Sequence, residues 1–392
     1  MRRKKLLRPR SFYVRKTWKK ALALPIGICI VLCCVLSLAL GPLLRAEPSN
    51  VPFAIVNLDK GAITIAGDSN IGETLTENLI TGESSLTGDD NEEDTDDSFQ
   101  DAISWTQLSS EKELMASLDQ NGFYGGVVVP SNFTSQEMNA KVGLSDAPEI
   151  KVYLNKGKNP QTANAMETTL EEEMLKAGIA CDIKMVNNVT LSDGAMSDTL
   201  ATQMLIMPLM IMTMICSIAT SLIFWHKDAL GIKKKKNAGC AAFVQGILVL
   251  ALSALVAAFA LFIVTTAGGL NLPAGNVFLL CWAGSFCCML CFVGLCNIAL
   301  PLGALVAVCT FALGMSTAML SPEMLPSFWA DWIYPWAPQA HIGNGVRSLV
   351  YFGQTPNQND IMPFVWFGIV GVLALVVAAI KAHKSSSQKK VH

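Results

Sequence analysis

Six long apolar runs, none of them interrupted by a charge, constrain this chain more than any other feature. An α-helix needs about 20 consecutive apolar residues to cross the ~30 Å hydrocarbon core of a bilayer. Hydrophobic residues make up 52% of the chain, which is high for a domain covered by polar surface. The sequence therefore predicts a membrane α-helical fold with six transmembrane helices, at residues 21–44, 200–225, 238–266, 277–300, 302–320 and 362–380.

The first run, residues 21–44, has to be distinguished from a cleaved signal peptide. The apolar core of a signal peptide is about 7–15 residues long. This run is clearly longer, so we expect a retained transmembrane helix. The predicted order is one helix, a polar domain at residues 45–199, and a five-helix domain at residues 200–380.

Basic residues at three places predict the orientation. They lie in the N-terminal segment 1–20, in the loop at residues 227–236, and in the tail 381–392. Lys and Arg near the ends of spans stay on the cytoplasmic side. An even number of predicted crossings separates each cluster from the others, so both termini are expected in the cytoplasm and residues 45–199 outside the membrane. The turn at residues 297–301 carries no charge and does not test this arrangement.

The predicted extracytoplasmic domain is acidic and of mixed α/β type. Apolar runs that end in turn residues predict three strands, at residues 51–59, 123–130 and 149–155. Ser109 or Ser110 is expected to cap a helix that runs to Leu118, and Ser131 to cap a short helix. A last helix is expected from Thr162 toward the second span, with Gly194 as an interruption.

An acidic run, Asp89 to Asp97, admits two interpretations. It could bind calcium, but it lacks the glycine and the terminal glutamate of an EF-hand loop. The alternative, a solvated loop, is favoured because blocks of like charge are usually disordered. Both interpretations stay open at this point.

The composition of the spans excludes several kinds of chemistry. No predicted span has an Asp, Glu, Lys, Arg or His in its interior, whereas proton-driven carriers usually keep such groups there. The phosphate-binding pattern G-x-x-x-x-G-K-[ST] is absent and the four histidines are scattered, so we expect no enzyme and no cofactor bound by this chain. Eleven of the 12 cysteines lie in apolar runs and are interpreted as packing residues; Cys181 alone lies in the polar domain.

The stretch 323–360 is too polar to span a membrane, yet it is rich in Trp, Tyr and Phe. Such a composition is typical of an amphipathic element that lies in the outer membrane interface. Two interpretations are open: a gate over a transport path, or an aromatic belt that anchors the last span.

Two motifs carry a resemblance to a known family. VPFAIVNLDKGA (51–62) with YGGVVVPSNFT (124–134) resembles the outer domain of the YhgE/Pip, or phage infection protein, branch of the ABC-2 type ABC transporter permeases. LPSFWADWIYPWAPQAHIGNGVRSLVYFG (325–353) is similar to the stretch between the last two spans of such permeases. The resemblance implies an outer gate formed by Leu325, Pro326, Trp329, Pro335, Pro338, Arg347, Tyr351 and Gly353.

The resemblance also implies partners. A separate ATP-binding subunit would supply ATP hydrolysis, and would contact Phe12 and Trp18 of the N-terminal segment together with Lys227, Lys233, Lys234, Lys235 and Lys236. A plain positive-inside signal explains the same charges. Two permease chains, identical or related, would form a homo- or heterodimer in a bacterial plasma membrane, among membrane lipids and without nucleic acid.

Two functions follow from these observations. The first is the permease subunit of an exporter for an unknown, amphiphilic substrate. The second is a non-transporting envelope protein whose outer domain acts as a receptor or scaffold. Five charge-free spans after the domain favour transport, because a binding module needs only one anchor.

Overall fold

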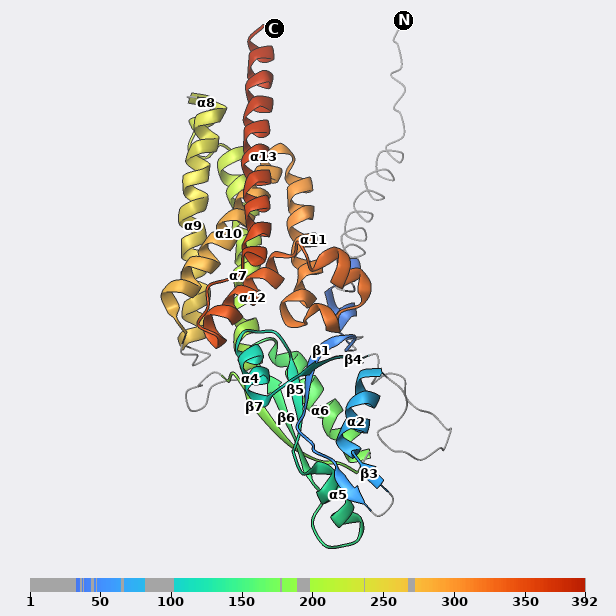
Figure 1. Cartoon of the computed structure of the whole chain (residues 1–392). Helices are drawn as coiled ribbons and strands as arrows, with labels where there is room; N and C mark the ends of the chain where they lie inside the picture. Colours follow the sequence, from blue (N-terminus) through green and yellow to red (C-terminus); the bar gives the residue numbers. More distant parts are fainter. Residues whose placement is uncertain are drawn as a thin grey trace, which may run out of the picture.

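A computed structural model describes residues 33–64, 67–81, 102–188, 198–266 and 272–391, except residues 36, 38, 44, 45, 47, 177 and 236. Two parts are visible in it: an α/β domain and a bundle of long helices (Figure 1). Within the described residues, five helices are long and apolar enough to cross a membrane. Most of the predicted first span lies outside the described residues. The positions of Cys33–Leu43 that are described are helical.

The α/β domain is built on a five-stranded sheet of order β4-β1-β5-β6-β7. Strand β1 pairs in parallel with β4 and β5, β5 pairs antiparallel with β6, and β6 pairs in parallel with β7. A small hairpin, β2–β3, lies apart from this sheet. The bounds of the strands are β1 Val51–Asn57, β2 Ala62–Thr64, β3 Gly67–Ser69, β4 Ile103–Leu108, β5 Gly125–Val129, β6 Glu149–Asn155 and β7 Ala180–Val186.

Helices cover both faces of the sheet, because its central strands are apolar on both sides. On one face, Phe53, Val127 and Val152 pack with side chains of α2, α5 and α6. On the other face, Ala54 and Val128 pack against α4. The helices are α2 Ile71–Thr81, α4 Glu111–Asp119, α5 Phe133–Lys141 and α6 Pro160–Lys176.

Asp59, in the turn after β1, ties three segments of this domain together. Its carboxylate accepts hydrogen bonds from the backbone N–H and the hydroxyl of Thr134 in the first turn of α5. It also accepts one from the N–H of Gly72, in the first turn of α2, at 3.3 Å. Orphan N–H groups at helix starts favour a carboxylate, so one side chain secures both helices. The motifs NLDKGA and PSNFT therefore meet in the fold through Asp59 and Thr134.

The structure confirms three predicted strands, decides between Ser109 and Ser110 as the cap, and corrects two other details of the domain. Ser110, not Ser109, caps α4 by accepting from the N–H of Glu113 at 3.2 Å, whereas Ser131 caps no helix. The helix expected from Thr162 toward the second span starts earlier and ends at Lys176. The chain turns at Gly178, which has a φ of +66°, and returns as β7.

The five membrane helices lie close to their predicted places. They are α7 Asp198–Thr220, which continues as the π-helical turn η1 Ser221–His226, α9 Ala238–Thr266, α10 Ala274–Ile298, α11 Leu300–Met319 and α13 Gln358–Val391. A short helix, α8 Ile232–Lys235, connects η1 to α9. Helix α13 continues past the predicted end at residue 380.

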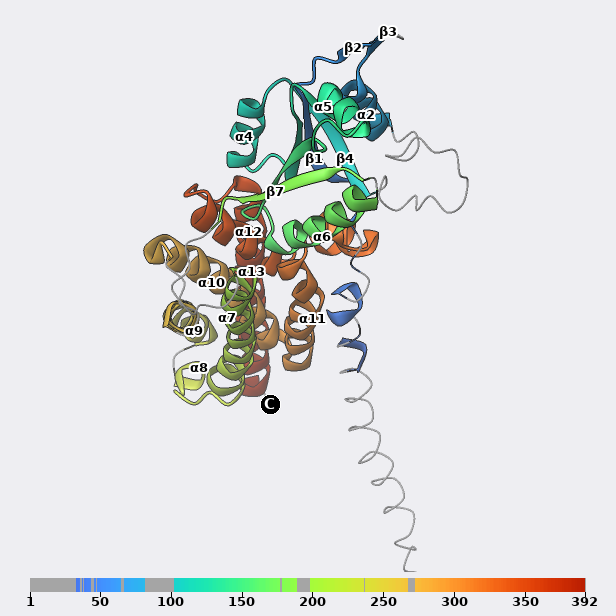
Figure 2. The same ribbon diagram turned by 90° about the horizontal axis from the view of Figure 1, so that it is seen from below.

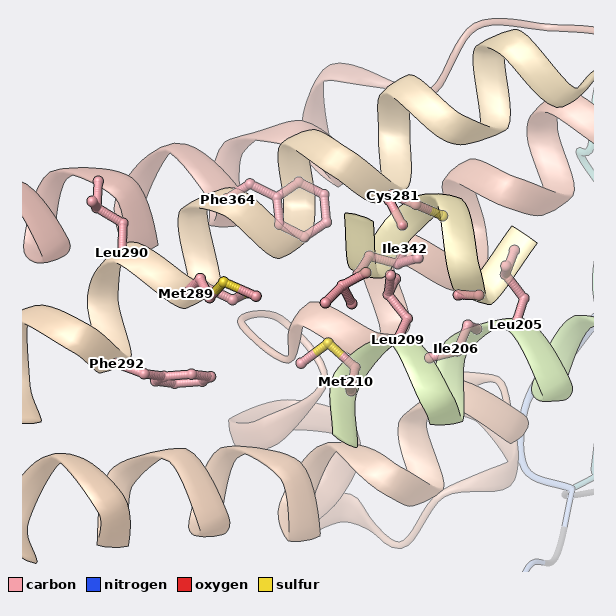
Figure 3. Packing of buried hydrophobic residues seen from close by; sticks show 14 of the residues in the cluster. Leu205, Ile206, Leu209, Met210, Cys281, Met289, Leu290, Phe292, Ile342 and Phe364 are labelled. Atoms are coloured by element: carbon pink, nitrogen blue, oxygen red, sulfur yellow. The ribbon is translucent and has the colours of Figure 1, made fainter. Parts of the chain in front are cut away.

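Helix α10 is the central helix of the bundle and packs against α7, α9, α11 and α13. Figure 3 shows its apolar side chains among those of α7, with Ile342 and Phe364 beside them. The contact with α13 is very close: a Cβ atom on Gly371 would lie 2.6 Å from the backbone N of Cys291. Without a hydrophobic driving force between helices in lipid, such close packing is what holds them together.

A second buried feature of the bundle is polar. The side-chain amide of Asn297 donates to Gln245 at 2.7 Å, and the hydroxyl of Ser221 donates to Asn297 at 2.8 Å. These three side chains join α10, α9 and η1. Hydrogen bonds between transmembrane helices contribute about 0.6–2 kcal/mol each, so this cluster fixes the three elements near the end that bears α8.

The segment between α11 and α13, here called the connecting segment (residues 320–357), links the bundle to the α/β domain. It contains a 3₁₀ turn, η2 Pro322–Met324, a π-helical turn, η3 Trp329–Ile333, and helix α12 Pro338–Tyr351. Figures 1 and 2 show it between the helices and the sheet, while α8 and the end of α13 lie at the opposite end of the bundle.

Candidate functional site

A polar cavity of about 660 Å³ lies between the α/β domain and the connecting segment. This volume is within the range of ~300–1,000 Å³ that small-molecule sites occupy. Its walls come from the end of α4 and the starts of β5 and α6 on one side, and from η2, α12 and the start of α13 on the other. The residues used below are Tyr124, Lys158, Glu323, Tyr334, Asn344, Arg347 and Asp360.

Helix α12 forms one wall, and the sequence fixes both of its ends. Pro338 occupies the first turn, where a missing N–H costs nothing. Gly353 follows the helix with a φ of +61°, a conformation that side chains with a Cβ rarely adopt. Between these ends, most of α12 is buried.

Arg347 of α12 is buried, with only 6% of its surface exposed. Its guanidinium donates to the side-chain oxygen of Asn344. Asn344 in turn donates to Asp360 at 3.0 Å and accepts from the hydroxyl of Tyr334 at 3.2 Å. The carboxylate of Asp360 also lies 3.3 Å from Nδ1 of His341, whose Nε2 donates to the Pro335 carbonyl at 3.0 Å. One connected network thus joins α12, α13 and the turn before α12.

Tyr124 and Glu323 join the two parts of the molecule across the cavity. The hydroxyl of Tyr124 donates to Oε2 of Glu323 at 2.8 Å. Burial, and then the charge of Glu323, raise the pKa of Tyr124 well above its ordinary value of 10. Next to this bond, the hydroxyls of Thr162 and Ser321 are 3.0 Å apart. The start of α6 therefore contacts the start of η2 directly.

Lys158 is the cation on the α/β side of the cavity. Its ammonium donates to the carbonyl of Gly122 at 2.7 Å and lies 4.6 Å from the ring centre of Tyr124. Burial lowers the pKa of Lys158 below its ordinary value of 10.5, and the charge of Glu323 offsets this only in part.

The structure separates the eight candidate gate residues into different roles. Arg347 lines the cavity, and Pro338 and Gly353 bound α12. Leu325 and Trp329 pack with Met324 in an apolar cluster of the connecting segment. The remaining three make backbone or packing contacts: the Pro326 carbonyl accepts from the N–H of Trp329, the Pro335 carbonyl accepts from His341, and the Cβ of Tyr351 lies against Gly157.

Most residues of the cavity could not be predicted from the sequence. Tyr124 lies in a predicted strand, Lys158 belongs to no motif, and Glu323 and Asp360 are only the first and last residues of the aromatic-rich stretch 323–360. The missed signal is a set of polar residues, such as Asn344, within the apolar face of a short helix. Asn344 bonds to residues 3 to 16 positions away, whereas Tyr124 and Glu323 meet across 199 residues.

The basic loop at the opposite end of the bundle shows a division of roles. Lys233 donates to the carbonyl of Trp225 at 2.5 Å and lies over its ring at 4.9 Å, so it closes the end of η1. Lys227 is exposed. The side chains of Lys234 and Lys235, the whole of Lys236, and the predicted contacts Phe12 and Trp18 lie outside the described residues.

Two alternatives from the sequence concern cations. The acidic run Asp89 to Asp97 lies outside the described residues. Among the residues that the structure does describe, no three or more His, Cys, Asp or Glu side chains form a group that could hold a metal ion. Four of the five cysteines of α10 are instead buried in the helix contacts, and the fifth, Cys287, is partly buried against them, as expected of packing residues.

These features define a multi-pass membrane protein whose helical bundle is joined to a sheet-containing α/β domain. The chain belongs to the ABC-2 family of transporter proteins: the model for "ABC-2 family transporter protein" matches residues 20–380. The match includes the α/β domain as well as the helices. Comparisons with curated proteins and with solved structures gave no match. Members of this family typically work with an ATP-binding subunit.

Proposed function

We propose that this chain is the permease subunit of an ABC-type exporter, driven by a separate ATP-binding chain. The family match over residues 20–380 is the observation that carries the proposal. Two permease subunits, identical or related, would enclose the transport path in a bacterial plasma membrane. Within the family we assign the chain to the YhgE/Pip branch, on the strength of the two motifs in the α/β domain.

The two ends of the helical bundle differ in a way that suits a permease subunit. The α/β domain, the cavity and the connecting segment share one end, and the basic loop lies at the other (Figure 1). If basic residues mark the cytoplasm, the exposed Lys227 and the N-terminal segment face the ATP-binding chain. Lys233 then supports this contact indirectly, because it holds the end of η1 in place.

The experiment is a purification of the tagged full chain from its own membranes in a mild detergent, with identification of the chains that accompany it. We expect an ATP-binding protein, and we expect Lys227→Glu to weaken its retention. Lys141→Glu, an equal charge reversal on the exposed surface of α5, is the matched control. Isolation of the chain alone, after gentle cross-linking as well, would overturn the transport proposal and favour the receptor or scaffold.

A further inference from the structure

The π-helical turn η3 of the connecting segment has two sides of different character. On one side, Trp329 and Ile333 pack in an apolar cluster with side chains of α11. On the other side, Phe328 and Trp332 are 52% and 71% exposed. Asp331 lies between these two rings in the sequence and is exposed as well. The turn therefore presents two large aromatic rings and one acid on its outward face.

The length of α11 places this outward face close to the surface of the membrane. The helix has 20 residues, and a rise of 1.5 Å per residue makes it about 30 Å long. This is the thickness of the hydrocarbon core, so α11 ends where the core ends. Trp329 shares an apolar cluster with Met319, the last residue of α11. The turn η3 thus lies at the boundary of the core, on the side of the α/β domain (Figure 1).

The three outward side chains suit the lipid headgroup region better than they suit hydrocarbon or water. A carboxylate such as that of Asp331 is costly to place in the hydrocarbon core, and two large rings are unfavourable in bulk water. At headgroup depth the rings leave water while the carboxylate stays hydrated. Among the described residues, none accepts a hydrogen bond from the indole N–H of Trp332. Headgroup oxygens and interfacial water supply such acceptors.

We propose that the outward face of η3, formed by Phe328, Asp331 and Trp332, lies in the lipid headgroup region on the side of the α/β domain. For these residues, this decides between the two interpretations of the aromatic-rich stretch: they anchor the protein in the membrane and do not line a transport path. The anchored segment also bears Glu323, which accepts the hydrogen bond from Tyr124. The lipid contact therefore holds the part of the chain on which the α/β domain rests.

The first test is photo-cross-linking of the full chain in phosphatidylcholine vesicles. Trp332→p-benzoylphenylalanine and Phe328→p-benzoylphenylalanine each place a photoreactive ring on the outward face, and mass spectrometry detects attached lipid. The matched control is the same substitution at Leu144 of the α/β domain, which is 78% exposed, and the lipid-facing reference is Leu255 of α9, which is 66% exposed. We expect lipid adducts at both positions of η3 and at Leu255, and none at Leu144.

The second test measures depth in the bilayer by quenching of tryptophan fluorescence. The emission of Trp332 is the difference between the wild type and Trp332→Phe. We expect phosphatidylcholine that is brominated near the headgroup end of its chains to quench this emission more than lipid brominated near the chain ends. The proposal is overturned if η3 gives no lipid adduct, if it cross-links to a second copy of the chain instead, or if the deeper bromines quench Trp332 more strongly.

This contact goes beyond the proposed transport function and does not depend on it, because a receptor or scaffold with the same fold needs the same anchor. A chain that gives lipid adducts at η3 but retains no ATP-binding partner refutes only the transport proposal. A chain that retains the partner but gives no adduct at η3 refutes only the membrane contact.

Discussion

At the scale of single residues, Asp59 shows how a short motif stabilises a domain. It accepts hydrogen bonds from the first turns of α2 and α5 at once. We expect Asp59→Ala to lower the free energy of unfolding by about 2 kcal/mol or more, since it leaves several partly buried donors without an acceptor. Thermal unfolding of the full chain in detergent, followed by tryptophan fluorescence, measures this. Asp68→Ala, at an exposed position of β3, should change the midpoint little; equal losses in both variants would contradict the role of Asp59.

Glu111 provides a pH dependence whose sign follows from its contacts. Its carboxylate accepts from the hydroxyl of Tyr153 at 2.5 Å, and this bond lowers the pKa of Glu111 below its ordinary value of 4.5; Lys151 adds to the effect. As the pH falls below 4.5, the carboxyl of Glu111 takes up a proton in the unfolded chain before it does so in the folded chain. The stabilisation is therefore present above pH 4.5 and is lost as the pH falls through the lower pKa of the folded chain.

The contribution of Glu111 is small, below about 1 kcal/mol, because the pair is partly exposed. Unfolding midpoints of the wild type and of Glu111→Gln between pH 3 and 6 measure it. The glutamine variant should lose less stability on acidification than the wild type does. Parallel curves would show that the bond to Tyr153 does not perturb the carboxyl.

At the scale of elements, two glycines of α13 give a matched test of helix contact. A Cβ on Gly371 would lie 2.6 Å from backbone atoms of α10, whereas a Cβ on Gly368 would meet the sulfur of Cys287 at 3.4 Å. Alanine favours a helix over glycine by about 1 kcal/mol at either position. We therefore expect Gly368→Ala to keep or raise the unfolding midpoint. Gly371→Ala should lower the midpoint, because overpacking lowers the free energy of unfolding by about 1–3 kcal/mol. A Gly371→Ala midpoint at or above that of the Gly368 variant would exclude the close crossing.

The elements also show what a sequence can predict and where it cannot. Strands β1 and β5 were predicted because they are buried on both faces and form continuous apolar runs, and β6 because buried apolar residues alternate in it with more exposed ones. Strands β4 and β7 were missed: they are the sheet edges, half-exposed and mixed with polar residues such as Asp182 and Lys184. Arg347 was found through its motif. Tyr124 and Glu323 were not paired, because contacts across 199 residues leave no local pattern.

At the scale of the whole molecule, the α/β domain and the basic loop occupy opposite ends of the bundle, and a cross-link can test both ends together. The hydroxyl oxygens of Thr162 and Ser321 are 3.0 Å apart, so cysteine sulfurs at these two positions would lie close enough to form a disulfide bond. We expect the variant with cysteine at both positions to form a disulfide under mild oxidation, detected as a linked peptide by mass spectrometry. Neither single variant should give it.

The disulfide-linked chain then tests whether the contact of the α/β domain with the connecting segment affects binding of the ATP-binding partner. The lock acts on η2 and the start of α6, whereas the proposed partner meets the exposed Lys227 at the far end. We therefore expect the oxidised variant to retain the ATP-binding chain as well as the reduced one does. If the disulfide does not form and both introduced thiols react with maleimide, the α/β domain does not contact the connecting segment at this point. Loss of the partner only on oxidation would show that movement at this junction reaches the far end of the helices.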